Sequence, residues 1–218
     1  MKSLAAARLY TILDLGYVAL DRAESVAGAL LEGGADVLQL RGKKESVPVL
    51  AALAEKLYRL TSAAGVPLII NDHPEIARDL PLEGLHLGQD DLPISAARAI
   101  VRRDCWIGKS THNLIQAWAA GDEGADYIGF GPLFATPTKP DYPAIGTFGI
   151  RRADELFLRP IFCIGGIKLS NLPDVLGAGA KRVVMVSDLL QSPDIAAATR
   201  AAKSLLSAVP LPPTKSVP

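Results

Sequence analysis

Cysteine is scarce in this chain, and so are the residue patterns that hold zinc. The 218 residues include only two cysteines, Cys105 and Cys163, each inside an apolar, strand-like run. We expect both to be buried, reduced thiols rather than a disulfide. No Cys-x-x-Cys pair and no cluster of cysteine with histidine occurs, so the sequence lacks the usual pattern of a zinc site. A chain of this length can build a core that needs no disulfide.

A surplus of charge and long hydrophobic runs are also missing. Twenty-three basic residues balance 23 acidic ones, which argues against a broad surface for nucleic acid or anionic membrane. No uninterrupted apolar segment approaches the roughly 20 residues that cross a bilayer. Arg8 and Asp14 interrupt the apolar stretch at the N-terminus, which we interpret as a first strand rather than a signal peptide. We therefore expect a cytoplasmic protein with neither nucleic acid nor membrane as a partner.

What the chain does contain is a regular alternation of two kinds of segment, one with the pattern of a helix and one with the pattern of a strand. Stretches rich in alanine and leucine with helical spacing, such as Val47–Ala64 and Asn113–Glu123, separate short apolar runs typical of buried strands. The eight strand-like runs are Leu9–Leu13, Asp36–Leu40, Pro67–Ile70, Gly84–Leu87, Cys105–Gly108, Asp126–Phe130, Pro160–Ile164 and Arg182–Val186. Continuous apolar strands that alternate with amphipathic helices indicate βα units and a parallel sheet.

Eight such units favour an α/β fold of one kind, a single (β/α)8 TIM barrel over residues 1–208. Phrases such as Gly34-Ala35-Asp36 before strands fit short turns that end a helix. A doubly wound open sheet is the alternative, but it usually has a glycine fingerprint after its first strand, and this chain has none there. We expect the proline-rich tail, residues 209–218, to be disordered.

Polar side chains follow the strands, at the end where a barrel of this kind forms its active site. Alternation along an extended chain points Gln39, Arg41 and Lys43 to one side. The other clusters after strands are Asn71-Asp72, Gly88 to Asp91, Ser110 to His112, Thr136 to Lys139, Gly165-Gly166 and Val186 to Asp188. Carboxylates beside cations suit a magnesium ion shared with substrate phosphates, and glycine turns before helices expose N–H groups to a phosphate.

Each cluster also has a structural alternative. Arg41 and Lys43 suit a solvated loop, and Asp72 and Asp91 suit helix N-caps ahead of nearby prolines. His86 lies inside an apolar strand, which favours a hydrogen-bonded core residue over a catalytic base. The recurrence of polar clusters at the same end of successive strands favours the functional interpretation.

The segments QLRGK, IIND, HLGQDD, IGKSTH, ADYIGFGPLFATPTK, IGGI and MVS occur in this order. Together they resemble the thiamine-phosphate synthase family from about Leu9 to Ala208. The resemblance implies a magnesium-dependent transferase of thiamine biosynthesis. This enzyme joins 4-amino-2-methyl-5-(diphosphooxymethyl)pyrimidine to 4-methyl-5-(2-phosphoethyl)thiazole and releases pyrophosphate.

The resemblance also implies roles for single residues. Gln39, Leu40, Arg41, Gly42, Lys43, Asn71, Ser110 and Lys139 would surround the pyrimidine diphosphate, with Arg41, Lys43, Ser110 and Lys139 catalytic. Asp72 and Asp91 would be the Mg²⁺ ligands. Thr136, Pro137, Thr138, Gly166, Val186 and Ser187 would form the pocket for the thiazole phosphate. The partners implied are these small-molecule substrates, and the sequence is compatible with a homo-oligomer.

The chain departs from the family pattern at a few positions. Gly42 stands where the family often has an acidic residue, and His73 stands where arginine is common. Two alternatives remain on the same scaffold: a thiazole tautomerase-like isomerase and a non-catalytic phosphate-binding barrel. The carboxylates Asp72 and Asp91 and the loop from Thr136 to Lys139 favour the synthase, because neither alternative needs a metal-bound diphosphate.

Overall fold

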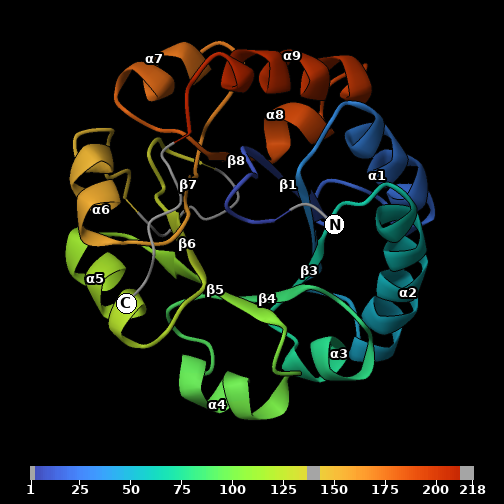
Figure 1. Cartoon of the computed structure of the whole chain (residues 1–218). Helices are drawn as coiled ribbons and strands as arrows, with labels where there is room; N and C mark the ends of the chain where they lie inside the picture. The colour runs from blue at the N-terminus through green and yellow to red at the C-terminus, as the bar shows by residue number, and fades with distance from the viewer. Residues whose placement is uncertain (1–2, 137–142, 212–218) are drawn as a thin grey trace.

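The structure, a computed structural model, describes residues 3–136 and 143–211. In this part of the chain, parallel strands close into a barrel in sequence order, with helices around it (Figure 1). The strands are β1 (Leu9–Asp14), β2 (Val37–Arg41), β3 (Leu68–Asn71), β4 (Gly84–Leu87), β5 (Trp106–Thr111), β6 (Tyr127–Phe130), β7 (Ile161–Cys163) and β8 (Val183–Met185). The pairing of Leu9 in β1 with Val183 in β8 closes the ring. The predicted TIM barrel is confirmed.

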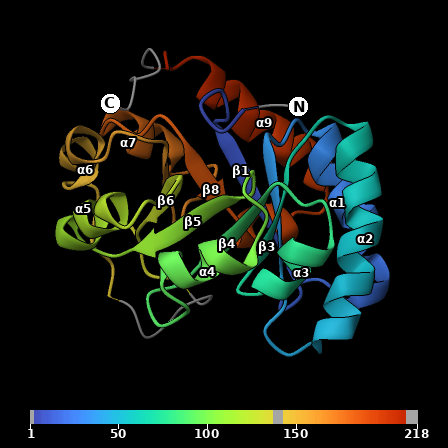
Figure 2. The ribbon, with the colours of Figure 1, turned by 60° about the horizontal axis from the view of Figure 1, so that its bottom comes forward.

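Helices follow the strands and cover the outside of the barrel. They are η1 (Leu20–Arg22), α1 (Ala23–Glu32), α2 (Val47–Ala63), α3 (Pro74–Asp79), α4 (Ile94–Ile100), α5 (Leu114–Asp122), α6 (Ile150–Leu156), α7 (Leu172–Gly177), α8 (Ser187–Leu190) and α9 (Ile195–Ser207). The tilted view of Figure 2 shows α3 and α4 outside β4 and β5. Each predicted strand run holds a strand, but β5 extends three residues beyond its apolar run to Thr111, because Ser110 and Thr111 pair with β6.

Two apolar clusters hold the barrel, one outside it and one inside. The outer cluster joins the outward side chains of the strands to the helices, and Leu40 and Ile107 belong to it. The inner cluster consists of Leu4, Ala7, Tyr10, Ile12, Val37, Ile69, Tyr127, Phe162 and Val184. Because successive side chains of a strand point to opposite faces, every second residue of a strand faces the interior of the barrel, up to the C-terminal end of the strand. This alternation decides which side chains reach the site.

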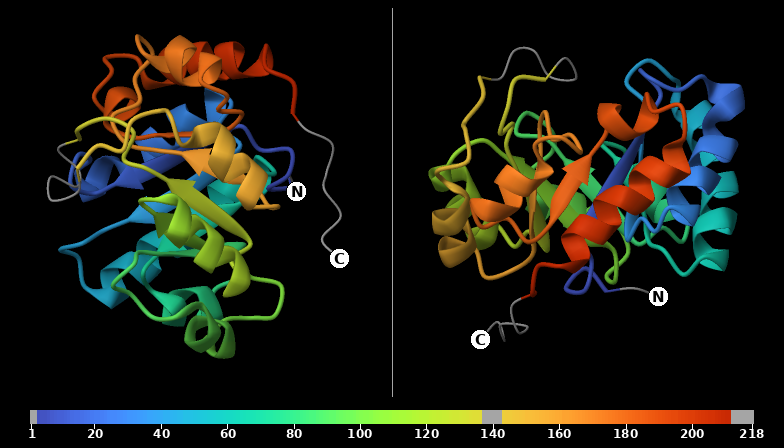
Figure 3. Two further views of the ribbon diagram at one scale, coloured as in Figure 1. Left: turned by 90° about the vertical axis from the view of Figure 1, so that its left-hand side faces the viewer. Right: turned by 90° about the horizontal axis from the view of Figure 1, so that it is seen from above.

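Turns at the helix ends agree with the predicted glycine pattern. Gly34, Gly65, Gly124 and Gly179 follow α1, α2, α5 and α7, and each has a positive φ that glycine adopts without a steric cost. Before β1, Leu4 and Ala7 pack into the inner cluster and close the N-terminal end of the barrel. Figure 3 shows the chain start (dark blue) at this end, away from the strand tips.

Both cysteines are free and buried, as expected. Burial raises the pKa of the Cys105 thiol to about 11 and that of Cys163 to about 12, so both are inert thiols at neutral pH. Within residues 3–136 and 143–211, the helices are too short or too polar to cross a bilayer.

Candidate active site at the C-terminal end of the barrel

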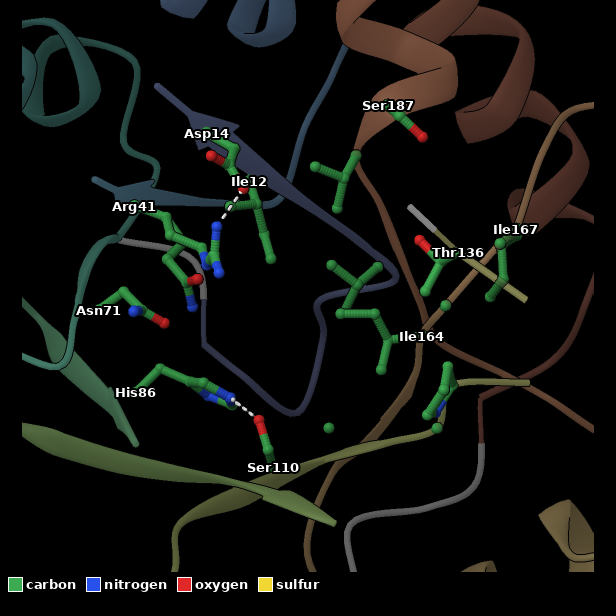
Figure 4. A pocket seen from close by; sticks show the side chains of 18 of the residues that line it. Ile12, Asp14, Arg41, Asn71, His86, Ser110, Thr136, Ile164, Ile167 and Ser187 are labelled. Atoms are coloured by element: carbon green, nitrogen blue, oxygen red, sulfur yellow. Dashed lines mark hydrogen bonds and ion pairs between the residues drawn. The ribbon is translucent and has the colours of Figure 1, made fainter. Parts of the chain in front are cut away.

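A pocket opens at the C-terminal ends of the strands, where the inner side chains continue above the apolar cluster (Figure 4). It encloses about 780 Å³, including the space at its mouth, which is within the usual range for small-molecule sites. The residues that line it are Ile12, Asp14, Gln39, Arg41, Asn71, His86, Ser110, Thr111, His112, Gly129, Gly131, Pro132, Thr136, Ile164, Gly165, Gly166, Ile167, Val184, Val186 and Ser187. Half of them lie in the strands, and the others lie in the segments that follow the strands.

Arg41 is held in the pocket wall by a carboxylate that the sequence interpretation missed. Its guanidinium lies 2.5 Å from Asp14 Oδ2, and the other oxygen of Asp14 accepts the backbone N–H of Gly16 at 2.8 Å. Asp14 and Arg41 are direct neighbours in the pairing of β1 with β2. The Asp14 side chain is 4% exposed and that of Arg41 15%, so this pair is shielded from water far more than a surface ion pair. The solvated-loop alternative therefore does not describe Arg41.

Lys43 and two carboxylates form a second charged cluster beside the pocket. The ammonium group of Lys43 makes an ion pair with Asp72, and the carboxylate of Asp72 in turn interacts with that of Asp91. Asp91 Oδ2 accepts the backbone N–H of Gly88 at 2.5 Å. Burial and the nearby carboxylate of Asp91 raise the pKa of Asp72, despite Lys43. For Asp91, burial is outweighed by the hydrogen bonds from Asp72 and Gly88, which lower its pKa.

Neither aspartate is a helix cap in this structure. His73 and Pro93 occupy the N-cap positions of α3 and α4, and neither makes a side-chain capping bond. Asp72 has φ +66°, and among the described residues it is the only one other than glycine with a positive φ. Such a backbone conformation costs free energy and recurs at functional sites. The Asp72 carboxylate is thus held toward Asp91 at the cost of local backbone strain.

The Asp72–Asp91 pair has the chemistry of a site for a hard cation. Two carboxylates that approach each other repel when both are ionised, and a divalent ion relieves that repulsion. Mg²⁺ is usually held by one or two carboxylates together with waters and substrate phosphates. In the described part of the chain, no group of three or more His, Cys, Asp and Glu side chains is placed to hold a metal alone. The pair therefore fits an ion that substrate phosphates help to bind.

The remaining polar wall consists of Gln39, Asn71, His86 and Ser110. His86 Nε2 lies 3.0 Å from Ser110 Oγ, and His86 Nδ1 lies 3.2 Å from the hydroxyl of Tyr127. The interpretation of His86 as a hydrogen-bonded residue agrees with these contacts, but its side chain also faces the pocket. Figure 4 shows Arg41, Asn71, His86 and Ser110 along one side of the pocket.

The opposite side of the pocket is formed by the ends of β6 to β8. Gly165 and Gly166 have φ of +97° and +64° in the turn after β7, where a Cβ at Gly166 would lie 2.7 Å from that of Phe134. Ser187 begins α8, and Thr136 and Ile167 lie on the same side of the pocket (Figure 4). This side has hydroxyl and backbone donors but no charged side chain among the residues that line it.

Some residues of the predicted site lie elsewhere. Leu40 is fully buried in the outer cluster, because alternation turns it away from Gln39 and Arg41. Gly42 does not line the pocket, and a Cβ there would lie 2.5 Å from Glu45 Oε2, so an acidic side chain would require the neighbours to move. His73 Nδ1 contacts Glu75 at 3.0 Å. Pro137, Thr138 and Lys139 lie outside the described residues, and their roles stay predictions.

Known proteins resemble the chain over almost its whole length. A family model described as thiamine monophosphate synthase matches residues 9–189. A thiamine-phosphate synthase of Chloroflexus aurantiacus is 41% identical over 201 residues, 92% of this chain and 93% of the relative. One of Thermus thermophilus is 43% identical over 188 residues, 86% of this chain and 88% of the relative. A solved thiamine phosphate pyrophosphorylase from Pyrococcus furiosus has a TM-score of 0.86 and 29% identity, and the match covers 94% of this chain and 97% of that one.

Proposed function

Since the chain belongs to the thiamine monophosphate synthase family, we propose that it carries out the reaction after which its relatives are named. It is a transferase of thiamine biosynthesis. It joins 4-amino-2-methyl-5-(diphosphooxymethyl)pyrimidine to 4-methyl-5-(2-phosphoethyl)thiazole, which gives thiamine phosphate and pyrophosphate. The observation that carries this conclusion is 41% identity to a thiamine-phosphate synthase over 92% of the chain.

The two sides of the pocket suit two different substrates. The side formed by β1 to β5 has the cation Arg41, and Lys43 lies beside the pocket; together they suit a diphosphate with its several negative charges. The side formed by β6 to β8 offers the Gly165-Gly166 turn and Ser187, which suit a single phosphate ester. Apolar side chains between the two sides, such as Ile164, can pack against the heterocyclic rings.

The reaction needs no nucleophile from the protein. When the C–O bond to the diphosphate breaks, its electron pair and negative charge pass to the leaving pyrophosphate, which Arg41 and Lys43 stabilise. The aminopyrimidine carries the positive charge that develops on its methylene carbon. The thiazole nitrogen then donates its lone pair to this carbon and forms the new C–N bond. By holding the two rings in the orientation that the reaction needs, the pocket lowers the entropic part of the activation free energy.

Magnesium is part of this proposal. Asp72 and Asp91 would hold the ion together with diphosphate oxygens, and Lys43 would keep Asp72 in place until the ion binds. When bound, Mg²⁺ would supply positive charge to the leaving group. The pairing of the two carboxylates and the strained backbone of Asp72 support this assignment.

Neither alternative function is supported by the comparisons. The relatives reported above are named as thiamine-phosphate synthases, and none is named as a tautomerase or a binding protein. The cytoplasmic location and a homo-oligomeric state stay predictions from the sequence.

Turnover of the two phosphorylated substrates tests the proposal. The purified protein, mixed with both substrates and Mg²⁺, should release pyrophosphate and form thiamine phosphate in equal amounts. The same mixture with excess chelator is the control, and we expect no turnover in it. Binding of the thiazole phosphate without any release of pyrophosphate would contradict the synthase function.

A further inference from the structure

A chain of hydrogen bonds crosses the interior of the barrel and joins two residues of the pocket wall. Gln39 Nε2 lies 2.7 Å from the hydroxyl of Tyr10, which lies 3.1 Å from the hydroxyl of Tyr127. Tyr127 contacts His86 Nδ1 at 3.2 Å, and His86 Nε2 contacts Ser110 Oγ at 3.0 Å. These residues come from β2, β1, β6, β4 and β5, so the chain runs across the barrel and not along its wall.

The two tyrosines are buried at the point where the pocket meets the inner apolar cluster. Each is 1% exposed, and burial raises the pKa of both hydroxyls, so each keeps its one proton. Both rings make T-shaped contacts with the ring of Phe162, with ring centres 5.3 and 5.8 Å away. The Tyr127 ring lies directly against Gly108, where any larger residue would clash, because a Cβ at Gly108 would lie 2.1 Å from the Tyr127 ring. The tyrosines are therefore built into the wall below the pocket.

The amide of Gln39 gives this chain a direction. Its Nε2 can only donate, so the Tyr10 oxygen accepts this hydrogen bond, and the single proton of Tyr10 is left for the contact with Tyr127, in which either hydroxyl can be the donor. If Tyr10 donates to Tyr127, then Tyr127 has its own proton to donate to His86 Nδ1, which is then the unprotonated ring nitrogen. A neutral imidazole with an unprotonated Nδ1 carries its proton on Nε2, which donates to Ser110.

The direction of donation along the hydrogen-bond chain determines whether Gln39 and Ser110, at its two ends, present a donor or an acceptor to the pocket. The buried Gln39 Oε1 has no hydrogen-bond partner among the described residues, so it remains an acceptor. With the proton of His86 on Nε2, Ser110 Oγ accepts from His86, and its own proton remains to be donated. One end of the chain is thus an acceptor and the other a donor. A buried polar atom without a partner costs free energy until a ligand satisfies it.

We propose that Tyr10, Tyr127 and His86 are positioning residues that fix Gln39 as an acceptor and Ser110 as a donor toward the substrate. This inference rests on the proposed function for the identity of the substrate. An aminopyrimidine diphosphate presents N–H donors on its amino group and acceptors on its ring and phosphates, so it complements this pair. A ligand with its donor and acceptor exchanged would place an acceptor against Gln39 Oε1 and a donor against the Ser110 hydroxyl, and neither contact is a hydrogen bond.

The tautomer of His86 tests the direction without any substrate. The protein has three histidines, and comparing ¹⁵N spectra of the wild type with those of His73→Gln and His86→Gln would assign their ring nitrogens. We expect the His86 proton on Nε2 at neutral pH, and Tyr127→Phe should shift the population toward Nδ1–H. Phe162→Leu changes the packing of the same rings but removes no hydrogen bond, and should leave the tautomer unchanged. A proton on Nδ1 in the wild type would overturn the proposal.

Kinetics test whether the direction matters to the reaction. Tyr127→Phe should lower kcat/KM for the pyrimidine diphosphate about 10-fold, the effect of one lost hydrogen bond, and leave KM for the thiazole phosphate unchanged. His86→Gln keeps a donor near Ser110 and should recover more activity than His86→Leu. Equal losses of kcat/KM in Tyr127→Phe and Phe162→Leu would show that the tyrosines act only through packing and not through their hydrogen bonds, and would overturn the proposal. An inactive wild type with the Nε2–H tautomer would instead contradict the proposed function alone.

Discussion

The two ends of the barrel use charged residues in different ways. At the N-terminal end, Asp36 accepts the backbone N–H groups of Arg8 at 2.9 Å and Leu9 at 3.1 Å and also pairs with Lys203. Arg102 donates to three backbone carbonyls, one in α3 and two in the connection between α3 and β4. Charges at this end are bonded to the backbone itself, so they complete the fold.

At the C-terminal end the charges are bonded mainly to one another. Arg41 pairs with Asp14, Lys43 with Asp72, and Asp72 also approaches Asp91. One member of each ion pair, Arg41 or Lys43, has further N–H donors that a ligand can use. Burial raises the pKa of Asp72, whereas hydrogen bonds lower those of Asp36 and Asp91 despite their burial. From the bonding partners, and not from these pKa shifts, we infer that the N-terminal charges stabilise the fold and propose that the C-terminal charges serve a ligand.

The largest effect should follow from Asp72→Asn. Asparagine also adopts positive φ, so the backbone should be retained, but the ionic ligand for Mg²⁺ is lost. We expect kcat/KM to fall about 100-fold or more, as when one charge-stabilising group is removed, with little change in melting temperature. Asp79→Asn, the same change at an exposed position of α3, is the matched control. Similar losses in both variants would break the distinction between the two ends.

Asp14→Asn should have a smaller effect on activity. Asparagine can still accept the Gly16 N–H, but Arg41 loses its ion pair and its fixed position. We expect kcat/KM to fall about 10-fold, mostly through kcat, because the charge on the leaving group builds up in the transition state. In an Arg41→Met background the same substitution should add little. Additive losses in a double-mutant cycle would show that Asp14 does not act through Arg41.

Asp36→Asn should change stability and leave activity unchanged. The substitution leaves one oxygen to accept and removes the charge that Lys203 pairs with. Urea unfolding should show a loss of about 1–3 kcal/mol in the free energy of unfolding, the usual cost of a disrupted buried polar group. The kcat/KM of the folded variant should stay within about twofold of wild type. A large fall in kcat/KM at full folding would contradict a purely structural N-terminal end.

The pH dependence of stability sharpens the same point. Burial alone would raise the pKa of Asp36, but hydrogen bonds from Lys203 and from the backbone of Leu9 and Arg8 lower it below 3.8. Its contribution to stability is therefore present above pH 3.8 and lost as the pH falls through the lower, folded-state pKa. Unfolding curves should show wild type losing more stability than Asp36→Asn as the pH falls below 3.8. Parallel curves would contradict this role of Asp36.

The sequence predicted the barrel because its signals are local. Apolar runs mark the strands, and the glycines before Asp36 and Asp126 mark the helix ends. Alternation also placed Gln39 and Arg41 on the inner face, as the structure has them, whereas Lys43, predicted with them, lies beyond the end of β2 and does not line the pocket. The end of β5 was missed, since Ser110 and Thr111 are held in the strand by pairing with β6 and not by their own apolar character.

The partners within the site depend on contacts between strands, which the sequence does not show. Asp14 ends β1 without a polar neighbour in sequence, and only the register of β1 with β2 brings it to Arg41. Tyr10 and Tyr127 have the character of core residues, and their hydroxyls acquire a role only when the barrel closes. Leu40 was included with its neighbours by motif, although alternation turns it into the outer cluster. Positive φ at Asp72 likewise has no signal in composition.

Calorimetric titration of pyrophosphate tests the contrast between the two ends most directly. In the presence of Mg²⁺, wild type and Asp36→Asn should bind pyrophosphate with the same affinity, and Asp72→Asn should bind it at least about 10-fold more weakly. Without Mg²⁺ the three proteins should bind weakly and alike. Equal, Mg²⁺-dependent binding by Asp72→Asn and wild type would contradict the assignment of the C-terminal charges to the ligand.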